Sequence, residues 1–156
     1  MRRKKSALLI YPVFVAWLLM PWIAPAFQQA DLERVKALYR CPGCDLADAD
    51  LTGVNLTYAD LSKANLSRAN LAGVQLGQAN LSGADLSGAD LTGAKLYMAN
   101  LTGANLTHAR LSGAKLYNAV LSNVNLSEAD LSEALWIDGK TCRAGSVGEC
   151  VKEEKK

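Results

Sequence analysis

The stretch ADLSGADLTG at residues 84–93 contains two copies of one five-residue unit. The unit continues in both directions, because a leucine stands at every fifth position from Leu46 to Leu131, eighteen in all. A small apolar residue stands two positions before each of these leucines. A repeat this regular decides the architecture of the chain, so it has to be interpreted before any other feature.

A period of five suits neither a regular helix nor a flat strand. In an α-helix, each step of five residues turns the leucine by about 140° around the axis, which scatters the apolar side chains. In a strand, an odd period sends successive leucines to opposite faces. The leucines can share one side only if the chain turns a corner in every unit.

We therefore expect coils in which the leucine and the small residue point inward. Four units with right-angled corners close a square coil of about twenty residues, and successive coils stack about 4.8 Å apart through hydrogen bonds of the parallel type. Glycine tolerates the backbone conformations that corners require. It stands two positions after the leucine at residues 53, 73, 83, 88, 93, 103 and 113. The prediction is an all-β solenoid.

These units resemble the A-(D/N)-L-x-x motif of the pentapeptide-repeat family, over roughly three fifths of the chain. The resemblance implies a right-handed quadrilateral β-helix, here of about four to five coils, with a short N-terminal capping helix. The same fold carries many different functions, so the resemblance speaks to structure more than to activity.

Residues 1–26 have the three parts of a secretory signal peptide. Basic residues 2–5 precede an apolar run over residues 7–23, and Ala24-Pro25-Ala26 forms a cleavage motif. This pattern predicts cleavage before Phe27. The alternative is an uncleaved membrane anchor, although the run is near the lower length limit for a span. Both interpretations place the repeats outside the cytoplasm, in the periplasm or, if the source is photosynthetic, in the thylakoid lumen.

The charge balance changes when this segment is removed. The whole chain has 17 basic and 15 acidic residues, a formal charge of +2, and four of the basic residues lie in residues 1–26. The remaining chain therefore carries a charge near −2. The excess of basic residues in the whole chain is therefore a feature of the targeting segment, and no nucleic-acid partner is expected.

Residues 27–43 are expected to form the capping helix and the turn that follows it. Leu32, Val35 and Leu38 are spaced three apart, Asp31 can cap the helix, and Pro42-Gly43 ends it. We expect this helix to shield the first leucines. A helix that binds a partner is the alternative.

Four cysteines form two local pairs, Cys41 with Cys44 and Cys142 with Cys150. The count alone allows three pairings. The two ends of the solenoid lie about 20 Å apart at this rise, whereas a disulfide needs Cα atoms within about 7 Å. We therefore expect Cys41–Cys44 and Cys142–Cys150 disulfides in an oxidising compartment. A redox-active or zinc-binding CxxC motif is disfavoured, because Cys44 points inward and the second pair is distant.

The repeat domain is expected to span residues 44–136, followed by a disulfide loop and charged tail at 137–156. Trp136 occupies the next leucine position, and its ring is expected to cover the last coil.

One side of the solenoid is predicted to bind a partner. Residues twenty apart should stack, which places Lys95 beside Lys115 and Tyr97 beside Tyr117. The two lysines repel each other without an obvious counter-charge, and the two tyrosines offer a flat amphipathic surface typical of interfaces. The alternative is that the tyrosines pack on each other and the lysines are simply solvated.

No catalytic, cofactor-binding or metal-binding residue is predicted. Carboxylates such as Asp85 and Asp90 should lie on a convex rod, without a cleft that excludes water. His108 is the only histidine and has no neighbouring ligands in the sequence.

The favoured function is an exported, non-enzymatic interaction or scaffold module with an unidentified protein partner, as a monomer or weak dimer. One alternative follows from resemblance to the gyrase-protecting pentapeptide proteins, which mimic DNA; it requires a cytoplasmic location and a strongly acidic surface. The other is a membrane-tethered module, if residues 1–26 are retained.

Overall fold

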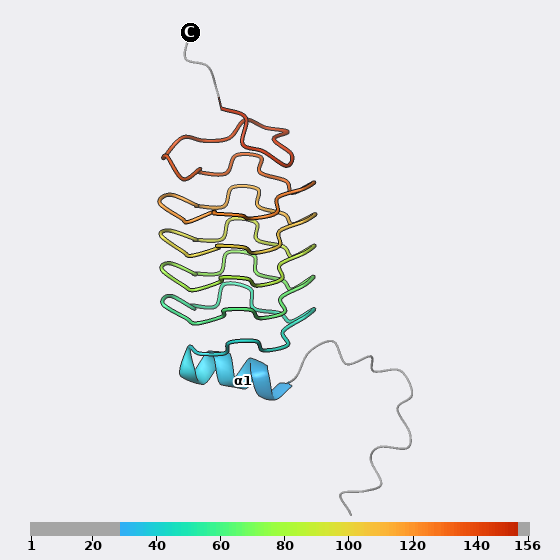
Figure 1. Ribbon diagram of the computed structural model, residues 1–156, viewed down its shortest axis with the longest axis vertical. Helices are drawn as coiled ribbons and strands as arrows, with labels where there is room; N and C mark the ends of the chain where they lie inside the picture. Colours follow the sequence, from blue (N-terminus) through green and yellow to red (C-terminus); the bar gives the residue numbers. More distant parts are fainter. Residues whose placement is uncertain (1–28, 153–156) are drawn as a thin grey trace, which may run out of the picture.

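The computed structural model describes residues 29–152. They form a rod of stacked coils, with helix α1 at one end and a C-terminal loop at the other (Figure 1). The predicted signal peptide and the cleavage position before Phe27 lie outside the described residues. Among residues 29–152, no helix has both the length and the hydropathy of a membrane span.

The coils pair in a constant register. Parallel bridges run from Arg40–Asp60 to Lys115–Leu135, and each joins residues twenty apart. The N–H of Leu86 donates to the carbonyl of Asn105 in the next coil at 2.7 Å, while the N–H of Ala89 turns back to the carbonyl of Leu86 at 3.1 Å. One bond thus links two coils and the other makes the corner, a pattern that nearly every unit repeats.

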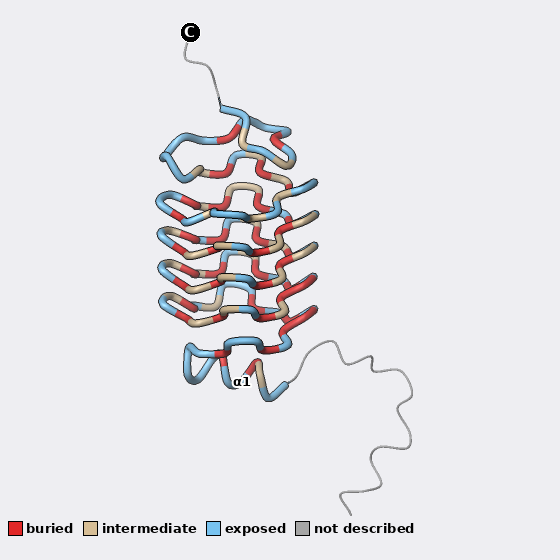
Figure 2. Tube along the Cα trace, in the orientation of Figure 1, coloured by how far each residue is buried: buried red, intermediate tan, exposed pale blue. Residues whose placement is uncertain are grey.

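The inward leucines form the core. Every repeat leucine from Leu46 to Leu116 is at most 1 % exposed, and buried residues recur along the inside of the coils in Figure 2. Burying one leucine contributes about 1.5–3 kcal/mol, whereas ordering the backbone of its unit costs about 5–10 kcal/mol. Contacts between coils must therefore supply the rest of the stability.

The corners have a common backbone conformation. The residue two positions after each leucine has a positive φ whether it is glycine, as at Gly53 (65°), or a larger residue, as at Tyr58 (65°) and Lys63 (57°). The residue before the leucine supports the turn. Asp60 Oδ1 accepts hydrogen bonds from the hydroxyl of Ser62 at 2.7 Å and from its N–H at 3.2 Å.

Helix α1 (Gln29–Leu38) packs on the first coil. Leu32 is 7 % exposed and Val35 is fully buried in the core cluster. Leu38, the third apolar residue of this spacing, is 66 % exposed and lies outside the core cluster. The helix ends at Leu38, and Tyr39 takes a φ of 51°, which turns the chain toward the first coil.

The opposite end of the rod is covered on two of its four sides. The N–H of Leu131 donates to the carbonyl of Ser146 at 2.8 Å, and that of Trp136 to Lys140 at 2.7 Å. Trp136 itself is only partly buried against the core. Leu121 and Leu126, on the other two sides, are also only partly buried. The C-terminal end of the rod is therefore covered less completely than the N-terminal end, where Leu32 and Val35 pack on the first coil.

Candidate interaction face

The structure brings together the four residues predicted to bind a partner, hereafter the Lys–Tyr face: Lys95, Tyr97, Lys115 and Tyr117. A parallel bridge joins Lys95 to Lys115, so their backbones are about 4.8 Å apart. Lys95 is exposed and Lys115 is half-buried. Both side chains start from the outward position before a buried leucine, so they leave the same side of the rod.

The two tyrosines lie beside these lysines, past the buried leucines. Tyr97 is half-buried, whereas Tyr117 is 45 % exposed. The backbone of Gly139 lies against the Tyr117 ring, because a Cβ at this position would be 3.4 Å from two ring atoms. Met98 follows at the corner and is 52 % exposed. The face therefore combines two positive charges with partly exposed aromatic and thioether groups.

Neither lysine of the face has a carboxylate within ion-pair distance among residues 29–152. Other basic residues of the rod do have such partners. Arg68 Nη2 lies 2.6 Å from Asp48 Oδ2, and Arg110 Nη1 lies 3.5 Å from Asp90 Oδ2. The positive charge of the face is thus available to an outside group.

On the neighbouring side of the rod, charged side chains are paired with one another. In its outward column, Arg110 pairs with Asp90 of the preceding coil. Hydrogen bonds from the side chain and backbone of Ser132, together with the charge of Arg110, lower the pKa of Asp130. The corner between the two sides carries glycines at residues 53, 73, 93 and 113, and a larger side chain stands there only in the last coil, at Glu133.

The remaining two sides carry amide ladders. Asn105 Nδ2 donates to Asp85 Oδ1 at 3.1 Å, and Asn80 Nδ2 donates to Asp60 Oδ1 at 3.3 Å. These contacts link the polar side chains of neighbouring coils on both sides.

His108 has a partner that the sequence analysis missed. Its Nδ1 lies 3.3 Å from Glu128 Oε2, with both side chains largely exposed. The signal was present in the sequence, because the two residues are twenty apart and therefore share a column.

Both cysteine pairs are disulfide-bonded in the structure. The Cα atoms are 5.4 Å apart in Cys41–Cys44 and 5.1 Å apart in Cys142–Cys150. No described cysteine is free. The first bond lies between α1 and the first coil, and the second holds the C-terminal loop.

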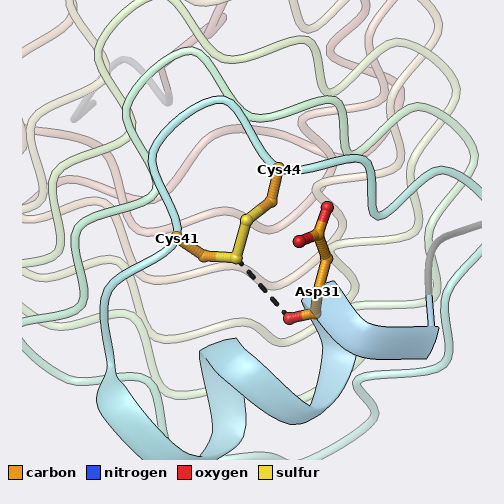
Figure 3. A group of neighbouring side chains, drawn as sticks. All are labelled: Asp31, Cys41 and Cys44. Carbon is orange, nitrogen blue, oxygen red and sulfur yellow. Dashed lines mark hydrogen bonds between the residues drawn. A yellow bond between two sulfur atoms is a disulfide. The ribbon is translucent and has the colours of Figure 1, made fainter.

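The first disulfide lies against the first turn of α1, beside Asp31 (Figure 3). Donor atoms of Asp31, Cys41 and Cys44 lie within 4.8 Å of one another. The group does not form a metal site in this state, because both sulfurs are engaged in the disulfide. The 3.5 Å approach of Cys41 Sγ to the Asp31 carbonyl is a close contact, since a disulfide sulfur carries no proton to donate. Sequence reasoning placed the helix at this end but not its first turn against the disulfide.

Comparison with known proteins agrees with the repeat pattern. A family model described as pentapeptide repeats matches the chain in eight copies, over residues 40–68, 69–107 and 104–135. No curated protein matches the chain significantly.

Several solved structures are similar. HetL, a pentapeptide repeat protein involved in heterocyst differentiation regulation from the cyanobacterium Nostoc sp. strain PCC 7120, is 34 % identical over 65 % of this chain and 51 % of its own, with a TM-score of 0.48. The chain thus spans about half the length of HetL. Rfr23 from the cyanobacterium Cyanothece 51142 is 31 % identical over 69 % of this chain and 97 % of its own, with a TM-score of 0.35. A pentapeptide repeat protein from the thylakoid lumen of Arabidopsis thaliana is 26 % identical over 71 % of this chain and 83 % of its own, with a TM-score of 0.37.

Proposed function

The chain belongs to the pentapeptide-repeat family, whose fold is a right-handed β-helix, and from this premise we propose that it is an exported, non-enzymatic module that binds another protein through the Lys–Tyr face. The observation that carries the proposal is the stacked pair Lys95 and Lys115, for which the described part of the chain provides no counter-charge. The described rod pairs Arg68 and Arg110 with carboxylates but leaves the two adjacent positive charges of Lys95 and Lys115 without one.

The chemistry of the face selects an acidic partner segment. Carboxylates spaced like the lysines would gain charge-assisted hydrogen bonds, and the field of the lysine pair would guide association. Tyr97 and Tyr117 offer ring surface for apolar groups and a hydroxyl for polar ones. The same positive charge argues against the DNA-mimic alternative, which requires an acidic surface.

The proposal includes the architecture and the compartment. We take residues 44–136 as four to five coils capped by α1, in the periplasm or the thylakoid lumen, after cleavage before Phe27. Pairing in a register of twenty and the burial of Leu32 and Val35 support the architecture. The predicted signal peptide and the two local disulfides support export, because disulfides persist in oxidising compartments.

Charge reversal tests the face. We expect the double substitution Lys95→Glu and Lys115→Glu to weaken capture of the partner by at least about tenfold and to remove its salt dependence. Lys36→Glu with Lys63→Glu is the matched control, since it makes the same charge change elsewhere on the rod. Equal capture by the two double variants would show that the face is not the binding surface.

Export is tested separately by the N-terminal sequence and intact mass of the protein in each cell fraction. A chain that starts at Phe27 in the exported fraction is expected. A full-length chain confined to the cytoplasm would overturn export, and a full-length chain in the membrane would favour the tethered alternative.

A further inference from the structure

The exposed apolar side chains of the coils gather at one corner of the rod, the corner that directly follows the Lys–Tyr face. Its residues in successive coils are Tyr58, Gln78, Met98 and Asn118, which all have a positive φ. Between residues 40 and 137, the exposed large apolar residues are Tyr58, Met98, Tyr117, Val120 and Ile137. In the register of twenty, each of them lies at this corner or within two residues of it. The other three corners carry none over the same range.

Hydrogen bonds between coils make these side chains neighbours along the rod axis. The N–H of Met98 donates to the carbonyl of Tyr117 in the next coil at 3.1 Å, and that of Asn118 donates to the carbonyl of Ile137 at 3.1 Å. Tyr58, two coils below Met98, is 69 % exposed. We call Tyr58, Met98, Tyr117 and Ile137 the apolar stripe. It spans four coil-to-coil steps, a length of about 19 Å.

The two borders of the apolar stripe differ in charge. On one side lie Lys95 and Lys115, which have no carboxylate partner among residues 29–152. On the other side, the amide of Asn80 donates to Asp60 at 3.3 Å, and Asp60 also lies 3.7 Å from Arg40 Nε. The stripe therefore runs between a free positive border and a border whose carboxylate is already paired.

The lysine pair and the stripe both run along the rod axis and lie within the width of one helix. Lys95 and Met98 are three residues apart in the same coil, so their columns are separated by at most about 10 Å. An α-helix with its side chains is about 10–12 Å across. One segment laid along the axis can therefore contact the lysines and the stripe together.

The spacing of the coils favours a helix over an extended strand as this segment. Side chains of the rod recur every 4.8 Å or so along the axis. Residues three or four apart on a helix lie about 5–6 Å apart on one face, so successive helical turns stay close to successive coils. Side chains on one face of a strand recur about every 6.7 Å, so a strand falls out of step after a single coil.

We propose that the partner segment is an acidic amphipathic α-helix that lies along the rod axis. Its acidic edge contacts Lys95 and Lys115, and its adjacent apolar edge covers the apolar stripe. At a rise of about 1.5 Å per residue, roughly 13 residues span the stripe. This inference rests on the proposed function, because it uses the same two lysines, and it adds the conformation and the direction of the bound segment.

Fluorescence anisotropy with synthetic peptides tests the proposal on the purified protein. The probe is a labelled peptide of about 16 residues, built from helix-forming residues, with glutamates along one edge and leucines along the adjacent edge. Two comparison peptides have the same composition in scrambled order and a central proline that breaks the helix. We expect the helical probe to bind with a dissociation constant at least tenfold lower than either comparison peptide.

Substitutions at the corner test the stripe itself. Tyr58→Asn with Met98→Asn should weaken binding of the helical probe at least tenfold. Both positions have a positive φ, which asparagine already adopts at Asn118, so the corners are expected to keep their backbone. The matched control is His108→Asn with Glu128→Asn, which alters two residues of the same φ on the opposite corner and should leave binding unchanged.

Three results would overturn the proposal, and they separate it from the proposed function. Equal binding of the helical, scrambled and proline-containing peptides would exclude a helix. Binding that is lost in the Lys95→Glu and Lys115→Glu variant but unchanged in Tyr58→Asn with Met98→Asn would exclude the stripe and leave the acidic partner in place. Protein that ignores every peptide but sediments with phosphatidylglycerol vesicles through the same residues would assign the face to a lipid surface, and both proposals would then fail.

Discussion

The carboxylate of Asp31 in α1 accepts a hydrogen bond from the backbone N–H of Asp45 at 3.1 Å, fourteen residues along the chain. This bond joins the helix to the first coil, directly beside the Cys41–Cys44 disulfide. Leu32 and Val35 of the same helix pack into the core at this end of the rod.

We expect Asp31→Ala to lower the free energy of unfolding by about 1 kcal/mol, because the Asp45 N–H loses a charged acceptor. Urea unfolding followed by circular dichroism measures the change. Glu33→Ala is the control, since that side chain is exposed and contacts only Gln29 among the described hydrogen-bond partners. If both substitutions have the same effect, the bond to Asp45 does not anchor the helix.

Position along the rod should determine the cost of removing a core leucine. Leu86 is fully buried between coils, so Leu86→Ala should cost about 2–5 kcal/mol. Leu126→Ala should lower the free energy of unfolding clearly less than Leu86→Ala does, because the Leu126 side chain is only partly buried. Denaturant unfolding of the two variants provides the comparison, and an equal loss would contradict the half-open end.

Two glycines of the same rod should respond in opposite ways to an added methyl group. Gly93 has a φ of 66° and no atom within 4 Å of an added Cβ, so Gly93→Ala should cost about 1 kcal/mol through backbone strain alone. A Cβ at Gly77, which lacks a positive φ, would meet Thr57 at an ordinary 3.7 Å. Gly77→Ala should therefore be neutral or stabilising by about 0.4–1 kcal/mol. Thermal unfolding of the pair measures the difference, and destabilisation by Gly77→Ala would refute this account of the corners.

Acid should destabilise the rod through its turn carboxylates. The hydroxyl and the N–H of Ser62 lower the pKa of Asp60 below its usual 3.8, with a smaller contribution from Arg40. The folded state binds this proton less readily than the unfolded state, so the stabilisation is fully present above pH 3.8 and is lost as the pH falls through the lowered pKa.

Urea unfolding between pH 7 and pH 2 tests the contribution of Asp60. We expect Asp60→Asn to flatten the acid limb of the stability curve, and Ser62→Ala to flatten it in part. An acid limb that Asp60→Asn leaves unchanged would assign the effect to other carboxylates, among which the pKa is also lowered for Asp48, Asp50, Asp90, Asp130 and Asp138.

The family could be predicted from the resemblance of the five-residue unit to the A-(D/N)-L-x-x motif, and the match over residues 40–135 confirms it. The period also predicts which residues become neighbours. It places Lys95 on Lys115, and the same rule applied to His108 would have found Glu128. A strict repeat therefore predicts which side chains stack in the same column.

The ends of the rod could not be predicted in the same way. The leucine period continues unbroken through Leu121 and Leu126, because the pattern within a coil does not depend on whether another layer lies above it. The half-open end results from the path of the loop, which depends on the Cys142–Cys150 bond and on contacts of the buried Ser146 hydroxyl. The exposure of Leu38 likewise depends on where α1 stops.

The constant register has a consequence for changes in chain length. An insertion of twenty residues between Gly103 and Gly113 would lengthen the rod by one level and keep every column aligned, although Lys95 and Lys115 would then be two levels apart. An insertion of five residues at the same place would rotate everything after it by a quarter turn. Lys115 would then emerge from the adjacent side, so the paired charge would vanish while each coil kept its own interior.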